Sequence, residues 1–123
     1  MAVGDVVAVK MLSGSTGGKG ILCTGSSSAG TVTVHTAINS GTSLDKVFLY
    51  AVNNSESLAL ATTILFGGTA TANNAIVKTV PRKDGLVMLC NGLPLQSGGV
   101  VSAFAATGSQ VTIYGEVWGV SAS

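Results

Sequence analysis

The chain has 123 residues and a mass of 12.1 kDa, which suits a single domain. It is 46% hydrophobic but only 9% charged, against about 25% in a typical soluble domain, and its net charge is +1. These values argue against a disordered chain, and they leave no basic stripe for a nucleic acid. A surface so poor in charge predicts a constant partner, either further copies of the chain or a large assembly.

The sequence carries no pattern for export or for membrane insertion. Its first residues lack the basic and apolar regions of a signal peptide, and an apolar stretch such as 58–66 is too short, because a membrane helix needs about 20 residues. Without export, Cys23 and Cys90 are predicted to be two reduced, buried thiols. A Cys23–Cys90 disulfide stays open as the alternative.

Polar and apolar residues alternate with a period of two rather than 3.6, which is typical of β-strands. In chain order, the predicted strands are 6–12, 20–24, 31–38, 46–52, 60–66, 75–80, 86–90, 100–105 and 110–118. The strand 46–52 is apolar on both faces, as a central strand is. The strand 75–80 ends at Pro81, which has no N–H for the ladder. Asn91-Gly92 predicts a tight turn, followed by an irregular loop over 93–95.

Eight or nine short strands with frequent turn signals predict an all-β protein, either an antiparallel β-sandwich or a small barrel. We expect a single-domain sandwich over residues 31–123. The segments 13–20 and 25–30 are rich in Gly and Ser, so residues 1–30 are predicted to form an N-terminal arm or edge hairpin. Such an arm can reach a neighbouring subunit, although a flexible terminus is the simpler interpretation.

The sequence contains no motif for catalysis or for metal binding. Residues 14–20 resemble a phosphate loop, but Ser13 replaces its first glycine and Gly20 its hydroxyl residue. The only histidine, His35, is predicted to be solvated or at an interface, because no nucleophile elbow accompanies it, although a Ser–His–Asp arrangement is formally possible. Cys23, Cys90 and His35 lack metal-ligand spacing. We therefore predict no enzyme, no metal and no cofactor.

Five side chains are candidates for contact with a partner. Lys10 and Lys19 belong to the predicted arm. Arg82 and Lys83 lie in the predicted loop 81–85, which is either a solvated turn or a contact for an acidic patch. Trp118 is a candidate anchor, because Trp is enriched at interface hot spots. The other five aromatic side chains are predicted to lie in strand cores: Phe48, Tyr50, Phe66, Phe104 and Tyr114.

Five segments between residues 43 and 119 combine strands with turn residues in a distinctive order. They are 43–53 (SLDKVFLYAVN), 64–69 (ILFGGT), 85–95 (GLVMLCNGLPL), 100–106 (VVSAFAA) and 111–117 (VTIYGEV). Read together, these segments resemble small structural proteins of tailed bacteriophages. One departure is Cys90-Asn91-Gly92, where those proteins usually carry Pro-Gly.

The resemblance implies a non-enzymatic capsid cement or decoration protein with a jelly-roll-like β-sandwich. Such a protein binds the assembled head lattice and stabilises it, so the implied partners are the major capsid protein and copies of the chain itself, commonly as a homotrimer. The implied location is the virion, assembled in the host cytoplasm, with neither nucleic acid nor membrane as a partner. Two alternatives stay open: a tail, neck or head-fibre component, and a lectin-like β-sandwich binding module.

Overall fold

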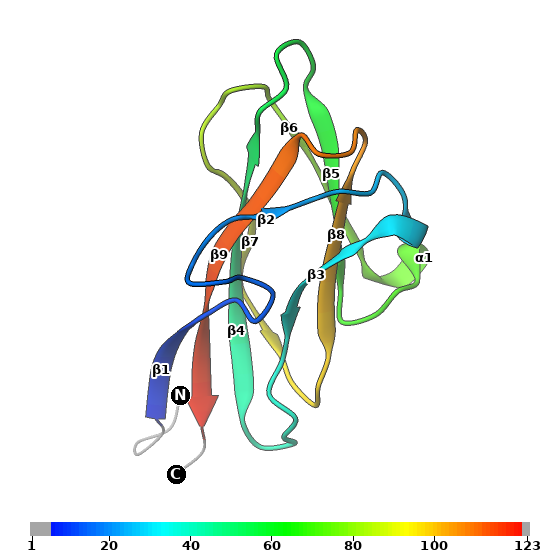
Figure 1. Cartoon of the computed structure of the whole chain (residues 1–123). Helices are drawn as coiled ribbons and strands as arrows, with labels where there is room; N and C mark the ends of the chain where they lie inside the picture. Colours follow the sequence, from blue (N-terminus) through cyan, green and yellow to red (C-terminus); the bar gives the residue numbers. More distant parts are fainter. Residues whose placement is uncertain (1–5, 122–123) are drawn as a thin grey trace.

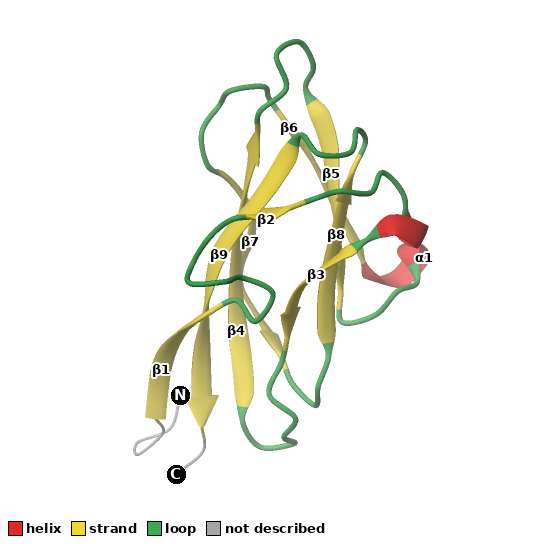
Figure 2. Cartoon of the chain, viewed as in Figure 1, coloured by secondary structure: helices red, strands yellow, loops and turns green. Residues whose placement is uncertain are grey.

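The computed structural model describes residues 6–121, which form two antiparallel β-sheets and little helix (Figure 1, Figure 2). The elements in chain order are β1 (Val6–Met11), β2 (Ile21–Leu22), the 3-10 turn η1 (Ser28–Gly30), β3 (Val32–Thr36), β4 (Leu44–Asn53), β5 (Leu60–Phe66), α1 (Thr71–Asn74), β6 (Ala75–Val80), β7 (Val87–Leu95), β8 (Val100–Ala105) and β9 (Val111–Ser121). The predicted all-β sandwich is confirmed.

The two sheets are connected by a chain that crosses between them at almost every turn. Sheet A has the order β1-β9-β4-β7, and β2 also pairs with β9, next to the half of β9 that β1 leaves free. Sheet B has the order β3-β8-β5-β6. From β2 onward, only the hairpin of β5 and β6 joins two strands of the same sheet. Most strand pairs therefore join segments that are distant in the sequence.

The core between the sheets is built from aliphatic side chains and two cysteines. Burial along β4 alternates strictly, so Val47, Leu49 and Ala51 face inward. On β9, Ile113 and Val117 are wholly buried in the same way. No aromatic side chain in the described part of the chain is fully buried. The core side of sheet A thus contains no aromatic side chain.

The prediction of five core aromatics is wrong for four of them. Phe48 and Tyr50 alternate with the buried residues of β4, and Tyr114 alternates with those of β9, so all three point away from the core. Phe104 alternates with the core residues of β8 and lies opposite Thr63, so it also points away from the core between the sheets. Phe66 packs partly against the core, as predicted. The reason for the difference on β4 is that both of its faces are apolar, which hides its inward direction.

The N-terminal segment is an integral part of sheet A where the structure describes it. β1 and β2 both pair with β9 and not with each other, and Leu12, Ile21 and Cys23 contribute to the core. Between the two strands the chain crosses to sheet B, where the Gly14 N–H donates to the Val34 carbonyl (2.9 Å). The predicted boundary after residue 30 therefore does not coincide with a break in the core. Residues 1–5 of the predicted arm lie outside the described residues.

The prediction of a tight turn at Asn91-Gly92 is wrong, because β7 runs through both residues to Leu95. Gly92 has a φ of 79°, and the register between β7 and β4 shifts at this point. The dipeptide is a β-bulge, in which glycine supplies the positive φ that a bulge requires. Any Cβ at Gly92 would also collide with the ring of Phe48.

Candidate interaction surface

The pairing of strands in sheet A determines which side chains share its outer side. Trp118 on β9 lies opposite Lys46 on β4 and opposite Val9 on β1. Tyr114 lies opposite Tyr50. Directly opposed residues of antiparallel strands point to the same face. Lys46 and Tyr50 alternate with buried residues of β4, so all five side chains point to the outside.

We call this side the outer face of sheet A. Its exposed apolar side chains are between 40% and 65% accessible: Val7, Val9, Met11, Leu22, Met88, Tyr114 and Trp118. Phe48 and Tyr50 are half-buried between them. The charged members of the face are Lys46 and Glu116, from neighbouring strands. An exposed apolar surface with a few polar groups is typical of an interaction site.

Trp118 is held in one orientation at the middle of this face. Its ring lies 5.4 Å from that of Phe48, centroid to centroid, with a tilt of 50° between the planes. The indole Nε1–H donates to Glu116 Oε2 at 2.6 Å. A large side chain whose orientation is already fixed loses little conformational entropy when a partner covers it. Trp118 therefore has the properties of an interface anchor.

Sheet B presents a different outer side. Leu65 on β5 points to the outer side of sheet B, but it is only 1% exposed. It lies opposite Ser102, and α1 packs against β5. Thr63 and Ser102 are also buried there. Both helical segments lie on the side of sheet B (Figure 2). Within residues 6–121, no helix covers the outer face of sheet A.

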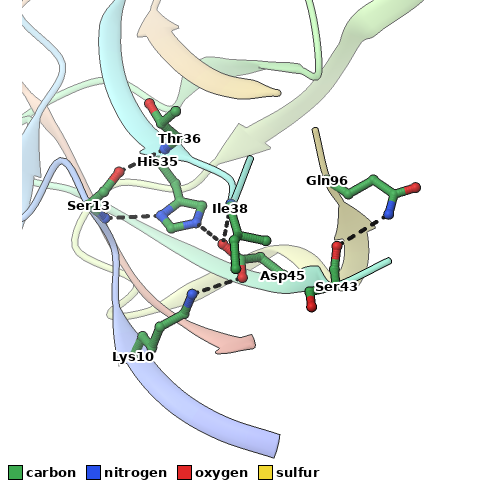
Figure 3. A network of polar contacts seen from close by, with 8 residues as sticks. All are labelled: Lys10, Ser13, His35, Thr36, Ile38, Ser43, Asp45 and Gln96. Carbon is green, nitrogen blue, oxygen red and sulfur yellow. Dashed lines mark hydrogen bonds and ion pairs between the residues drawn. The ribbon is translucent and has the colours of Figure 1, made fainter. Parts of the chain in front are cut away.

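A buried polar network joins the two sheets near the start of β4 (Figure 3). Asp45 is 1% exposed, and its carboxylate accepts hydrogen bonds from Lys10 Nζ (2.9 Å), His35 Nε2 (2.8 Å) and the Ile38 N–H (3.2 Å). Burial alone would raise the pKa of Asp45, but the bonds from His35, Lys10 and Ile38 and the charge of Lys10 lower it below the ordinary value. The network thus holds an ionised carboxylate that ties β1, β3 and β4 together.

His35 has both ring nitrogens engaged in this network. The Ser13 N–H donates to His35 Nδ1 at 3.0 Å, and a backbone N–H can only donate, so the ring proton sits on Nε2 and points to Asp45. The Ser13 hydroxyl oxygen accepts from the Thr36 N–H instead (2.7 Å). Although a Ser, a His and an Asp meet here, the hydroxyl is not bonded to the imidazole.

The prediction of a solvated or interface His35 is wrong, because the ring is 3% exposed. The register of β3 against β8 shifts between Thr33 and His35, so that both Val34 and His35 turn inward. Simple alternation along the strand would have placed them on opposite faces.

The predicted partner contacts are spread over the surface. Trp118 lies on the outer face of sheet A, whereas Lys10 on β1 turns inward to Asp45. Lys19 is exposed in the segment between β1 and β2, and Arg82 and Lys83 are exposed between β6 and β7. Lys83 Nζ pairs with Glu56 Oε1 at 3.1 Å. The structure brings none of the four cations to Trp118, and their contact with a partner stays a prediction.

Other parts of the molecule offer little chemistry. A pocket of about 310 Å³ lies between the turns after β5 and before β8, lined by Gly67, Gly68, Thr69, Gly98, Gly99, Val100 and Ser102, and so by no charged side chain. Among the described residues, no three His, Cys, Asp or Glu side chains gather as metal ligands. Cys23 and Cys90 are buried and free, and burial raises the pKa of Cys23 to about 11.

Comparison of the chain with protein-family models, with curated proteins and with solved structures gave no match. Neither helical segment within residues 6–121 is long and apolar enough to cross a bilayer.

Proposed function

We propose that this chain is a non-enzymatic cement or decoration protein of a phage capsid, which binds the assembled head lattice and stabilises it. The observation that carries the proposal is the outer face of sheet A, an apolar and aromatic surface that no element within residues 6–121 covers. Its partner would be the major capsid protein, with Trp118 as the central anchor.

Three physical features support a lattice-binding role. The sandwich supplies a stiff support, because a buried network fixes its N-terminal strand. The net charge of +1 allows many copies to lie close together without strong mutual repulsion. A protein that binds only the assembled lattice adds its binding free energy to that state, and repeated copies make weak individual contacts sufficient.

We further infer that the sandwich is a jelly roll. When β1 and β2 are taken as one interrupted strand along β9, eight strands remain, in two sheets of four. All but one of the connections after β2 cross from one sheet to the other. This arrangement is consistent with the two Greek keys of a jelly roll. A jelly roll is also the fold that the resemblance to phage structural proteins implies.

The first test is to count copies of the chain in density-banded virus particles from a producing culture by quantitative mass spectrometry. Hundreds of copies in a simple ratio to the major capsid protein are expected. A few dozen copies would instead identify a tail, neck or head-fibre component. Absence from the particles would overturn the virion proposal.

The second test addresses the docking face. Particles assembled without the chain are titrated with purified wild type, Trp118→Ala and Val77→Ala. Trp118 is 40% exposed on the outer face of sheet A, and Val77 is 60% exposed on the edge strand β6 of sheet B. Trp118→Ala is expected to weaken binding at least about tenfold, and Val77→Ala to leave it within about twofold. Equal effects of both substitutions would rule out the outer face of sheet A as the docking surface.

A lectin-like module is a second candidate, and one observation favours it. Tyr50, Tyr114 and Trp118 place aromatic side chains on an exposed sheet face beside Lys46 and Glu116, and exposed aromatic side chains of this kind are typical of sugar-binding modules. Binding of the purified chain to a defined glycan, abolished by Trp118→Ala, would favour this candidate. Lattice binding without any glycan signal would exclude it.

A further inference from the structure

β1 has an edge that no other part of the described chain occupies. All six of its residues pair with β9 in an unbroken register, from Val6 opposite Ser121 to Met11 opposite Glu116. Within residues 6–121, no strand pairs with its other edge, and Figure 1 shows β1 at the margin of sheet A, beyond β9. Every second backbone N–H and C=O of such a strand points outward, ready to pair with another chain.

The remaining edge strands carry features that hinder such pairing. β7 has two register shifts against β4 and contains Pro94, which lacks an N–H. The edge strand β3 is covered by the segment that follows β1, because Ser13 and Gly14 form hydrogen bonds with the backbone of β3. β6 carries Lys78 and ends just before Pro81. Natural proteins protect sheet edges with features of this kind, and β1 lacks both a proline and a bulge.

The one charge on β1 is neutralised within the subunit. A lysine that points inward on an edge strand normally opposes further pairing, because a neighbouring strand would bury its charge. Lys10 Nζ lies 2.9 Å from Asp45 Oδ1 and is already paired. The other side chains of residues 7–11 are Val7, Ala8, Val9 and Met11, all apolar. β1 is therefore the edge of the described chain best suited to receive a second strand.

We propose that two copies of this chain pair through β1, antiparallel, around a two-fold axis. An antiparallel strand is complementary to itself under such an axis, so one surface provides both sides of the contact. With the axis at Val9, the Val9 residues of the two copies are opposed and Val7 of each lies opposite Met11 of the other. Lys10 then lies opposite Ala8, whose small side chain leaves the contact with Asp45 undisturbed. All pairs on the outer side are apolar.

This pairing makes one continuous sheet from the two copies of sheet A. A two-fold axis normal to the sheet keeps the outer faces on the same side, so the exposed apolar surfaces of the two copies adjoin along β1. The pairing does not depend on the lattice-binding proposal, since it occurs between isolated copies. It also predicts a dimer, in contrast to the homotrimer that the resemblance implies.

The test measures mass and cross-linking of the purified chain in solution. Sedimentation or light scattering is expected to give twice the 12.1 kDa mass of one chain. Directly opposed residues lie about 4.5–5.5 Å apart at Cα, within disulfide range, so Val9→Cys should form a covalent dimer on mild oxidation. Val77→Cys, on the edge strand β6 with a similar exposure of 60%, is the matched control. Wild type, whose two cysteines are buried, gives the background.

A disrupting variant completes the test. Val9→Lys places two like charges in opposition across the axis, while Val9 is 65% exposed and tolerates a long side chain. This variant is expected to have the mass of one chain and to unfold cooperatively, at a midpoint that does not change with protein concentration. A monomeric or trimeric wild type would overturn the proposal. So would cross-linking of Val9→Cys no faster than that of Val77→Cys.

Discussion

The two faces of sheet A are both apolar, but only one of them has a partner within the described chain. On β9, Ile113 and Val117 are fully buried against sheet B, whereas Tyr114 and Trp118, their neighbours in sequence, are each 40% exposed. On β4 and β9 the apolar side chains of the inner face are aliphatic, and the aromatic ones all lie on the outer face.

The difference between the faces follows from the chemistry of the side chains. Aliphatic groups have no polar atom to satisfy and can fill a closed core. Tyr and Trp combine an apolar ring with a hydroxyl or an N–H, which suits a surface that is wet in one state and covered in another. Apolarity alone therefore does not identify a core face, and an aromatic face suggests a surface that is covered intermittently.

The largest loss of folding stability is expected from substitution of Asp45, the buried carboxylate on the inner face of sheet A. Asp45→Ala leaves the His35 Nε2–H and the Ile38 N–H buried without an acceptor. Removing one partner of such a buried pair costs about 3–5 kcal/mol. Denaturant unfolding followed by fluorescence gives the value. The control is Lys83→Met at the exposed pair with Glu56, where the change should stay within about 0.5 kcal/mol. Equal effects of the two substitutions would contradict a buried role for Asp45.

Acid should reduce the stabilisation that Asp45 provides on the inner face of sheet A. The pKa of Asp45 is lowered in the folded state, so the unfolded chain, with an ordinary value of about 3.9, takes up the proton first. The contribution of this carboxylate is complete above that value and is lost as the pH falls through the folded pKa. Unfolding midpoints of wild type and Asp45→Asn should therefore converge below about pH 4. A constant gap down to pH 2 would refute this assignment.

Two adjacent residues of β9 compare the faces directly. Ile113→Ala empties part of the closed core and should cost about 2–5 kcal/mol. Tyr114→Ala removes an exposed ring that lies opposite Tyr50 and beside Gly20, and should cost about 0.2–1 kcal/mol. Urea unfolding of the two variants gives the ratio. Similar losses would mean that the outer face is covered in solution, as by a second copy of the chain.

The smallest effect is a gain in stability. Thr62 on β5 is fully buried, and its hydroxyl is the one buried side-chain group of the described residues that lacks a hydrogen-bond partner. Thr62→Val keeps the shape of the side chain and removes the unsatisfied group, so stability should rise by about 1 kcal/mol. A loss on thermal unfolding would show that a buried water satisfies this hydroxyl.

Much of the fold could be read from local patterns. The predicted bounds of β5, β6 and β8 agree with the structure, because β5 stops at Gly67, β6 stops at Pro81 and β8 follows Gly99. The direction of β4 was harder to read, since both of its faces are apolar. A usable signal was present, because Lys46 shares its side of β4 with Phe48 and Tyr50, and Glu116 shares its side of β9 with Tyr114 and Trp118. A charge marks the exposed side of a strand more reliably than an aromatic ring does.

Two features could not be predicted from local patterns. Alternation fails at His35 and at Gly92, because a β-bulge inserts one residue and reverses the facing of those that follow. The contact of His35 with Asp45 then depends on β3 and β4 meeting from opposite sheets, which the topology determines. The candidate surface was found in part, since Trp118 was identified and its aromatic neighbours were not.

The position of β9 at the centre of sheet A has a consequence for biosynthesis. β9 pairs with β1, β2 and β4, and Val6 lies opposite Ser121. The first strand to be synthesised therefore pairs with the last one. While the chain leaves the ribosome, the apolar β1 has no native partner until almost the whole domain has been made. Contacts this distant in sequence slow folding and prolong the exposure of apolar, aggregation-prone segments. When many copies are synthesised at once, partly synthesised chains can associate through β1 before β9 is available. The time needed to synthesise β9 therefore affects the yield of folded protein.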